Sequence, residues 1–171
     1  MKREIKEQFA ESIGQLRLPR YAEIPDVGLY LEQTVCYIDS FLSPLQETAL
    51  TPSMVSNYVK KGLISNPVKR RYGRDQIAHL IFIALAKNIL SLDNISKLLG
   101  MGLKIYTPEK AYNYFCQEFE NLLYFVFEYK EILDEIGEGA TEEKQILRNV
   151  VVAMTYKFYL DKTMSAMDEI E

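Results

Sequence analysis

Long apolar runs are missing from this sequence of 171 residues. No stretch approaches the roughly 20 uncharged apolar residues that a membrane-spanning helix needs, so no membrane segment is predicted. The start of the chain, Met1-Lys2-Arg3-Glu4-Ile5-Lys6-Glu7, has no apolar region of the kind found in secretion signals. We therefore expect a globular protein of the cytoplasm.

Side chains for covalent, metal or redox chemistry are also scarce. Cys36 and Cys116 each fall within an apolar helical pattern with no second Cys or His nearby, which predicts two buried thiols rather than zinc ligands or a disulfide. The single histidine, His79, lies among apolar residues, which favours packing over catalysis. No nucleophile stands beside a base, and no glycine-rich phosphate loop occurs. We expect no enzymatic activity, no metal and no cofactor.

Acidic residues are absent between Thr51 and Arg74, although six Lys and Arg residues lie there. The other 14 Lys and Arg residues of the chain face 24 Asp and Glu residues, which gives the remainder a net charge of −10. A basic segment on an acidic body indicates a surface for a polyanion, most commonly the phosphates of nucleic acid. A solvated surface loop is the alternative interpretation.

A short helix with a polar face is predicted over residues 52–61, at the start of the basic segment. Thr51 provides a capping hydroxyl, Pro52 suits the first helical position, and Gly62 ends the helix. Residues 63–65 and 68–72 then read as two short strands of a hairpin with a turn at Asn66-Pro67. The exposed face of the helix, which has a composition suited to the major groove of DNA, consists of Ser53, Ser56, Asn57 and Lys60.

The remaining pattern is mainly helical. We expect an amphipathic N-terminal helix with Ile5, Phe9, Ile13 and Leu16 on its apolar side, followed by an extended arm over residues 18–27. Further helices are predicted over residues 28–43, 75–89, 92–99, 108–136 and 142–167. A hinge is predicted at Gly100-Met101-Gly102, and Gly137-Glu138-Gly139 joins the last two helices into a hairpin.

The first helix of the C-terminal hairpin has apolar residues at heptad spacing and a second apolar face. A helix that is apolar on two sides needs two partners, so we expect the same surface of a second chain to complete a twofold dimer. The aromatic residues of this region also fit a pocket for a small hydrophobic effector, although core and dimer packing is favoured. The expected dimer contacts are Phe115, Phe119, Leu122, Val126, Tyr129 and Leu133.

The span from Thr51 to Leu99 resembles the MerR-type winged helix-turn-helix. The matching residues are Tyr58, Gly62-Leu63-Ile64, Arg71-Tyr72, Gln76-Ile77, Leu80, Phe82-Ile83, Ser91-Leu92, Ile95 and Leu98-Leu99. The whole chain is similar to an uncharacterised bacterial family with a MerR-like half and an all-helical tail. The usual Arg-Tyr-Tyr of the reading helix stands here as Ser56-Asn57-Tyr58, so the resemblance does not transfer a base preference.

The resemblance implies a mainly α protein with three parts. These are an N-terminal helix and arm (residues 1–27), a winged helix DNA-binding domain (28–102) and a helical hairpin for dimerisation (103–171). The implied function is a sequence-specific transcription regulator that binds double-stranded DNA as a homodimer. The alternative is a protein-interaction module that keeps the fold without binding DNA. The expected DNA contacts are Ser53, Ser56, Asn57, Tyr58, Lys60, Lys61, Lys69, Arg70, Arg71, Tyr72 and Arg74.

Overall fold

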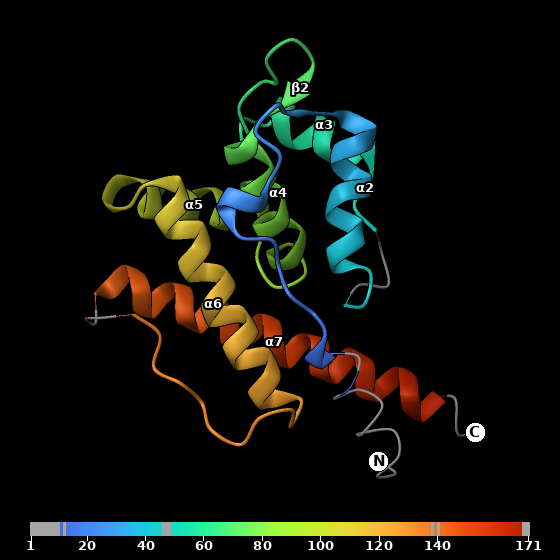
Figure 1. Cartoon of the computed structure of the whole chain (residues 1–171), viewed down its shortest axis with the longest axis vertical. Helices are drawn as coiled ribbons and strands as arrows, with labels where there is room; N and C mark the ends of the chain where they lie inside the picture. Colours follow the sequence, from blue (N-terminus) through green and yellow to red (C-terminus); the bar gives the residue numbers. More distant parts are fainter. Residues whose placement is uncertain (1–10, 12, 46–48, 138, 140, 169–171) are drawn as a thin grey trace. The chain divides into compact units, whose positions relative to one another are not determined.

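The structure is a computed structural model that describes residues 11, 13–45, 49–137, 139 and 141–168. Over these residues the chain is mainly helical and carries one sheet of two strands, so the expected mainly α class is confirmed (Figure 1). No helix in the described ranges is both long and apolar enough to span a membrane. Ile5 and Phe9 of the predicted N-terminal helix lie outside the described residues.

The chain divides into two compact units. Pro19–Asn113 form one, which we call the middle unit, and Met1–Leu18 with Tyr114–Glu171 form the other, which we call the outer unit. The boundaries expected at residues 27 and 102 do not coincide with this division. The extended arm after Leu18 belongs to the middle unit. The boundary at the other end of that unit, after Asn113, falls inside the helix α6 (Pro108–Val126).

The middle unit contains most of the helices, in the order η1 (Tyr21–Glu23), β1 (Leu29–Tyr30), α2 (Leu31–Leu42), α3 (Pro52–Lys60), β2 (Arg71–Tyr72), α4 (Arg74–Ala86), α5 (Leu92–Ile105) and the start of α6 (Pro108–Val126). Helix α4 forms the core, because all its residues from Gln76 to Ala86 are buried except His79. Helix α2 packs against both α3 and α4. Cys36, expected to be buried, is instead exposed on α2, whereas Cys116 is buried.

Local capping signals fix two helix starts as predicted. The Thr51 hydroxyl accepts the backbone N–H of Met54 at 3.2 Å, and the Ser91 hydroxyl accepts that of Asn94 at 3.2 Å. The hinge predicted at Gly100-Met101-Gly102 is wrong, since α5 runs through it to Ile105. Glycine in a helix costs about 1 kcal/mol relative to alanine, which a helix with other favourable contacts tolerates.

The predicted hairpin is only partly correct, because its principal partner lies far upstream. Strand β2 pairs in antiparallel fashion with β1, in the register Leu29↔Tyr72 and Tyr30↔Arg71. On the other side of β2, Val68 forms a bridge with Arg71, whereas residues 63–65 are not a strand. The helix predicted from Gly28 begins at Leu31, since residues 29 and 30 form β1.

The arm before β1 is held to the rest of the middle unit by specific contacts. The Tyr21 backbone N–H donates to Asn113 Oδ1 at 2.9 Å, and the Tyr21 hydroxyl donates to the Asp75 carboxylate. Burial and this hydrogen bond raise the pKa of Tyr21 to about 12. Ile24 is fully buried, so the arm contributes this side chain to the core of the middle unit.

The outer unit contains the second part of α6, the chain that joins it to the helix α7 (Glu142–Asp168), α7 itself, and the chain around Ile13 to Leu18. Its core is aromatic: the rings of Phe119 and Phe158 meet edge to face, with centroids 6.2 Å apart. Ile13 and Leu16 of the predicted N-terminal helix are buried. The helix predicted over 142–167 is confirmed by α7.

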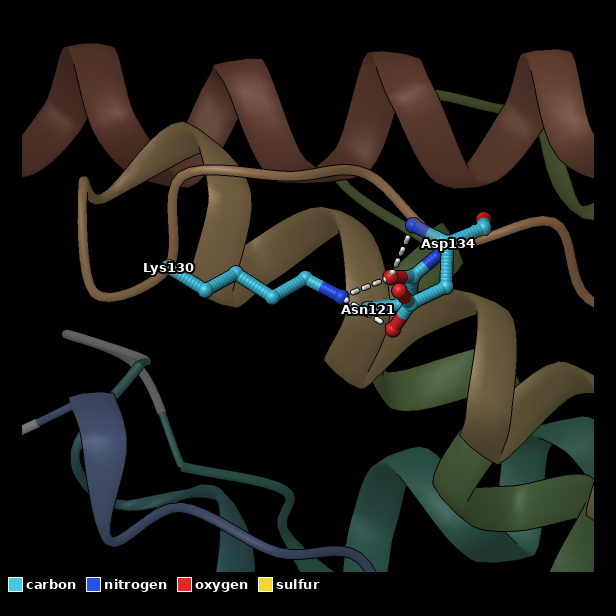
Figure 2. A network of polar contacts seen from close by, with 3 residues as sticks. All are labelled: Asn121, Lys130 and Asp134. Atoms are coloured by element: carbon cyan, nitrogen blue, oxygen red, sulfur yellow. Dashed lines mark hydrogen bonds and ion pairs between the residues drawn. The ribbon is translucent and has the colours of Figure 1, made fainter.

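Helix α6 ends at Val126, so the prediction of a helix to Ile136 is wrong. Glu128 has φ +62°, in the left-handed region, and the chain turns back along α6. The buried Asn121 receives this returning chain: its Nδ2 donates to the Asp134 carbonyl at 2.8 Å, and its Oδ1 accepts the Asp134 N–H at 3.1 Å. Figure 2 shows Lys130 also reaching Asn121 and the Asp134 carboxylate, the latter at 2.8 Å.

The expected dimer contacts on α6 are therefore corrected. Phe115, Phe119 and Leu122 are no more than 4% exposed because they pack inside the outer unit. Tyr129 and Leu133 lie beyond the end of α6, so they do not continue its face. The six predicted residues do not form one surface available to a second chain.

Candidate nucleic-acid interface

Helix α3 has one buried face and one exposed face. Val55 and Tyr58 are buried on the side that packs toward α2. The side chains of Ser53, Ser56, Asn57 and Lys60 are all exposed, as the amphipathic pattern predicts. Among the predicted contact residues, these four thus present hydroxyl, amide and ammonium groups to solvent along a single helix.

The loop after α3 is fixed at its base. Gly62 has φ +71°, a conformation that glycine adopts without steric cost, and the N–H groups of Leu63 and Ile64 donate to the Tyr58 carbonyl at 2.9 and 3.4 Å. The buried side chain of Gln76 then joins this loop to the start of α4. Its Nε2 donates to the Ser65 carbonyl at 2.8 Å, while its Oε1 accepts the Gly73 N–H at 2.7 Å.

Lys69 and Arg70 occupy the tip of a tight two-residue turn. Val68 and Arg71 exchange both backbone hydrogen bonds across it, at 3.1 and 2.9 Å. Lys69 has φ +50° and Arg70 φ +64°, the pattern of a type I′ turn, which usually contains Asn-Gly. A left-handed conformation costs a non-glycine residue roughly 1–2 kcal/mol. The turn therefore places two exposed cations at its tip at the expense of local backbone strain.

Arg71 is held in place by β1, which the sequence analysis did not identify. Directly paired residues share a face of a sheet, so Tyr30, Arg71 and Val68 form one row across the strands. The Arg71 guanidinium lies over the Tyr30 ring, with Cζ 4.7 Å from the ring centroid. Its Nη2 donates to the Tyr30 hydroxyl at 3.3 Å. Nη1 donates to the Val27 carbonyl at 3.4 Å. A guanidinium has five N–H donors, so others remain for a phosphate.

Tyr30 was therefore a missed residue of this surface. Its signal in the sequence was Gly28-Leu29-Tyr30, a glycine followed by an apolar residue and by tyrosine, which is enriched in strands, placed directly before a helix. Gly28 has φ +74°, and a Cβ there would lie 3.1 Å from the Cβ of Arg71. The left-handed φ and the close approach of these two strands both favour glycine at position 28.

Three predicted contact residues do not reach this surface as expected. Arg74 turns toward the arm: its Nε donates to the Ile24 carbonyl at 2.9 Å, and its Nη1 lies 3.6 Å from the Asp26 carboxylate. Tyr58 and Tyr72 are each only 4% exposed, and burial raises the pKa of both hydroxyls. These two tyrosines belong to the core, because Tyr58 faces inward from α3 and Tyr72 pairs with Leu29.

Eight of the eleven predicted contact residues remain exposed: Ser53, Ser56, Asn57, Lys60, Lys61, Lys69, Arg70 and Arg71. Figure 1 shows α3 and β2, with the loop between them, at the same end of the middle unit. We call these eight residues with Tyr30 the basic surface. No group of three or more His, Cys, Asp or Glu side chains suited to a metal ion occurs among the described residues.

Neither the curated proteins nor the solved structures include a match to this chain. Residues 19–115, which are 97 of the 171, match a protein family. The matched region begins where the middle unit begins and ends within two residues of its end at Asn113, so it includes the arm, β1 and the whole basic surface. The chain belongs to the family described as Domain of unknown function (DUF1836).

Proposed function

We propose that the middle unit is a winged helix-turn-helix that binds double-stranded DNA as a sequence-specific transcription regulator of the cytoplasm. The observation that carries the proposal is the basic surface. Five exposed Lys and Arg residues lie within twelve positions of the chain, beside a helix face of Ser and Asn, with no acid from Thr51 to Arg74. A protein of net charge −4 gathers cations in this way when it has a polyanionic partner.

In this proposal α3 enters the major groove. Asn57 pairs with the exposed edge of adenine, and Ser53 and Ser56 serve as donors or acceptors to several bases. A groove about 12 Å wide admits an α-helix, and the exposed face of α3 carries no large side chain besides Lys60 to obstruct it. These residues would supply the choice of sequence.

The cationic residues would position the protein on the phosphates. Lys69 and Arg70 project from the turn, Lys60 and Lys61 lie at the end of α3, and Arg71 is oriented by Tyr30. Five neutralised phosphates give an expected salt slope of about −4.5, at ~0.9 per phosphate. Removal of any one cation would lower the affinity for all duplexes alike, because phosphates carry no sequence information.

The first experiment measures affinity for duplex DNA as a function of salt concentration. Replacing Lys69→Ala and Arg70→Ala together should reduce the magnitude of the slope by about 2. The matched control is Lys97→Ala with Lys104→Ala, which removes two exposed cations from α5 in the same unit. A slope near zero for the natural chain, or equal losses in both double variants, would contradict phosphate binding by the basic surface.

The second experiment tests sequence choice by selection from random duplexes. Asn57→Ala should change the recovered sequence, whereas Asn94→Ala, an exposed asparagine on α5, should not. An unchanged preference in Asn57→Ala would reject α3 as the reading helix. A natural chain that enriches no sequence at all would favour a module that docks acidic proteins through the same surface.

A further inference from the structure

Helix α7 has apolar residues on two opposite faces. Its inner face is buried in the outer unit through Val151, Met154 and Phe158, each no more than 2% exposed. On the opposite side, Tyr156, Leu160, Met164 and Met167 are 49%, 50%, 55% and 54% exposed, and Ala153 is also exposed. We call these five residues the outer stripe.

The outer stripe is narrow and straight. An α-helix turns ~100° per residue, so all five side chains lie within about 40° of Leu160 around the helix axis. The stripe extends from Ala153 to Met167, a length of ~21 Å. Contiguous apolar surface of this kind is uncommon on monomeric proteins and marks a binding face.

The spacing of the stripe has a symmetry that a binding face for another protein would not need. The intervals between its residues are three, four, four and three, so the average step of 3.5 is that of a coiled-coil seam. The same intervals are read in both directions from Leu160. A stripe that is palindromic in position matches a copy of itself turned through 180°.

We propose that the outer stripe binds the outer stripe of a second copy of this chain, antiparallel and with the twofold axis at Leu160. In this pairing Leu160 faces the partner's Leu160, Tyr156 faces the partner's Met164, and Ala153 faces the partner's Met167. A small residue then lies opposite a long one at each end, which lets the two helices approach without a void.

The charges beside the stripe favour this occupant over a membrane. Lys157 and Asp161 form an ion pair of 2.5 Å at one edge, and the stripe itself contains no charged residue. Helices that lie on anionic membranes carry a polar face rich in Lys and Arg, whereas α7 has only two Lys residues over the length of the stripe, and one of them is paired with Asp161. A neutral, self-matching seam fits a second helix of the same composition.

The stripe is short, which sets the expected strength of the dimer. Stable interfaces bury about 800 Å² on each partner, and five side chains of one helix supply less than that. We expect a dimer that dissociates on dilution, with a Kd in the micromolar range, ~8 kcal/mol. This inference is independent of the proposed function, because it concerns the outer unit and needs no DNA.

Sedimentation of the full chain over a range of concentrations tests the stripe as the interface. The natural chain should shift from monomer to dimer, and Leu160→Glu should remain monomeric, since it brings two carboxylates together on the twofold axis. The matched control is Ile132→Glu, because Ile132 is 73% exposed in the same unit but lies outside α7. A natural chain that stays monomeric at ~100 µM, or a Leu160→Glu variant that still dimerises, would overturn the proposal.

Disulfide trapping tests the antiparallel register. In a Cys36→Ser background, which removes the exposed thiol, Leu160→Cys should form a cross-linked dimer by itself. Tyr156→Cys should link to Met164→Cys in a mixture but not to itself, because its own copy would be eight residues away, ~12 Å, beyond the ~7 Å limit for a disulfide. Self-linking of Tyr156→Cys would overturn the antiparallel arrangement. An intrachain link between Leu160→Cys and Phe9→Cys would assign the stripe to the N-terminal segment instead.

Discussion

The two units of this chain carry opposite charge and expose different chemistry. The middle unit has 11 Lys and Arg against 8 Asp and Glu, a net charge of +3, whereas the outer unit has 9 against 16, a net charge of −7. The middle unit exposes cations, hydroxyls and an amide on its basic surface, and the outer unit exposes a row of apolar side chains on α7. The family match covers the whole of the middle unit and only residues 114 and 115 of the outer unit.

The two units are therefore suited to different partners. Cations on a short helix and a tight turn match a charged and hydrated ligand, whose binding depends on salt. An uncharged seam matches another apolar surface, whose binding depends on the area removed from water. The two proposals therefore place DNA binding and self-association in separate parts of the chain, so that substitutions designed to abolish one should not directly affect the other.

The largest expected effect separates the core of the outer unit from its exposed stripe. Phe119→Ala should lower the free energy of unfolding by about 3–5 kcal/mol, since the ring is fully buried against Phe158. Leu160→Ala, measured on dilute monomer, should change it by less than ~1 kcal/mol because half of that side chain is already in water. Urea denaturation followed by circular dichroism measures both. Equal losses would break the distinction between the inner and outer faces.

A smaller effect separates stability from binding in the middle unit. Lys69→Asn with Arg70→Gly gives the turn its preferred residues, so it should stabilise the protein by about 1–2 kcal/mol and at the same time weaken DNA binding. The control is Lys69→Ala with Arg70→Ala, which removes the charges but keeps two side chains in the left-handed region. Thermal denaturation and DNA titration of both variants measure the two effects. A destabilised Asn-Gly variant would show that the turn is not strained.

The smallest expected effect concerns pH. Burial lowers the pKa of His79 below its ordinary value of 6.5, and the nearby Asp75 offsets part of this shift. Below pH 6.5 the unfolded chain binds a proton that the folded chain resists, so stability should fall as pH decreases, by at most ~1.4 kcal/mol per unit. His79→Gln should flatten the profile between pH 7 and 5.5. An unchanged profile in that variant would assign the dependence to other groups.

Features set by neighbouring residues could be predicted from the sequence. The caps at Thr51 and Ser91, the exposed face of α3 and the bounds of α7 all depend on side chains within one or two turns. Of the eleven contact residues predicted from the sequence, eight lie exposed on or beside α3 and the turn. The mainly helical class followed from the same periodicity.

Features set by distant residues could not be predicted. Strand β1 forms only because β2 pairs with it, and α6 ends at Val126, after which the chain turns back so that Asp134 binds Asn121. Arg74 was expected to contact a phosphate because of its charge. The sequence does not reveal that its side chain binds the Ile24 carbonyl and the Asp26 carboxylate instead. From periodicity we expected an exposed second apolar face on α6, whereas the structure has one on α7. Periodicity identifies apolar faces, but it does not indicate which of them another part of the same chain covers.

The pairing of β1 with β2 sets a limit on how this protein can be dissected. A synthetic peptide of residues 51–74 would carry every cation of the basic segment, yet it would lack Tyr30 and the Val27 carbonyl that orient Arg71. In such a peptide the Arg71 side chain would sample many rotamers, and this conformational freedom would be lost when the peptide binds a duplex. Fragments intended for crystallisation with an oligonucleotide should therefore begin no later than Pro19.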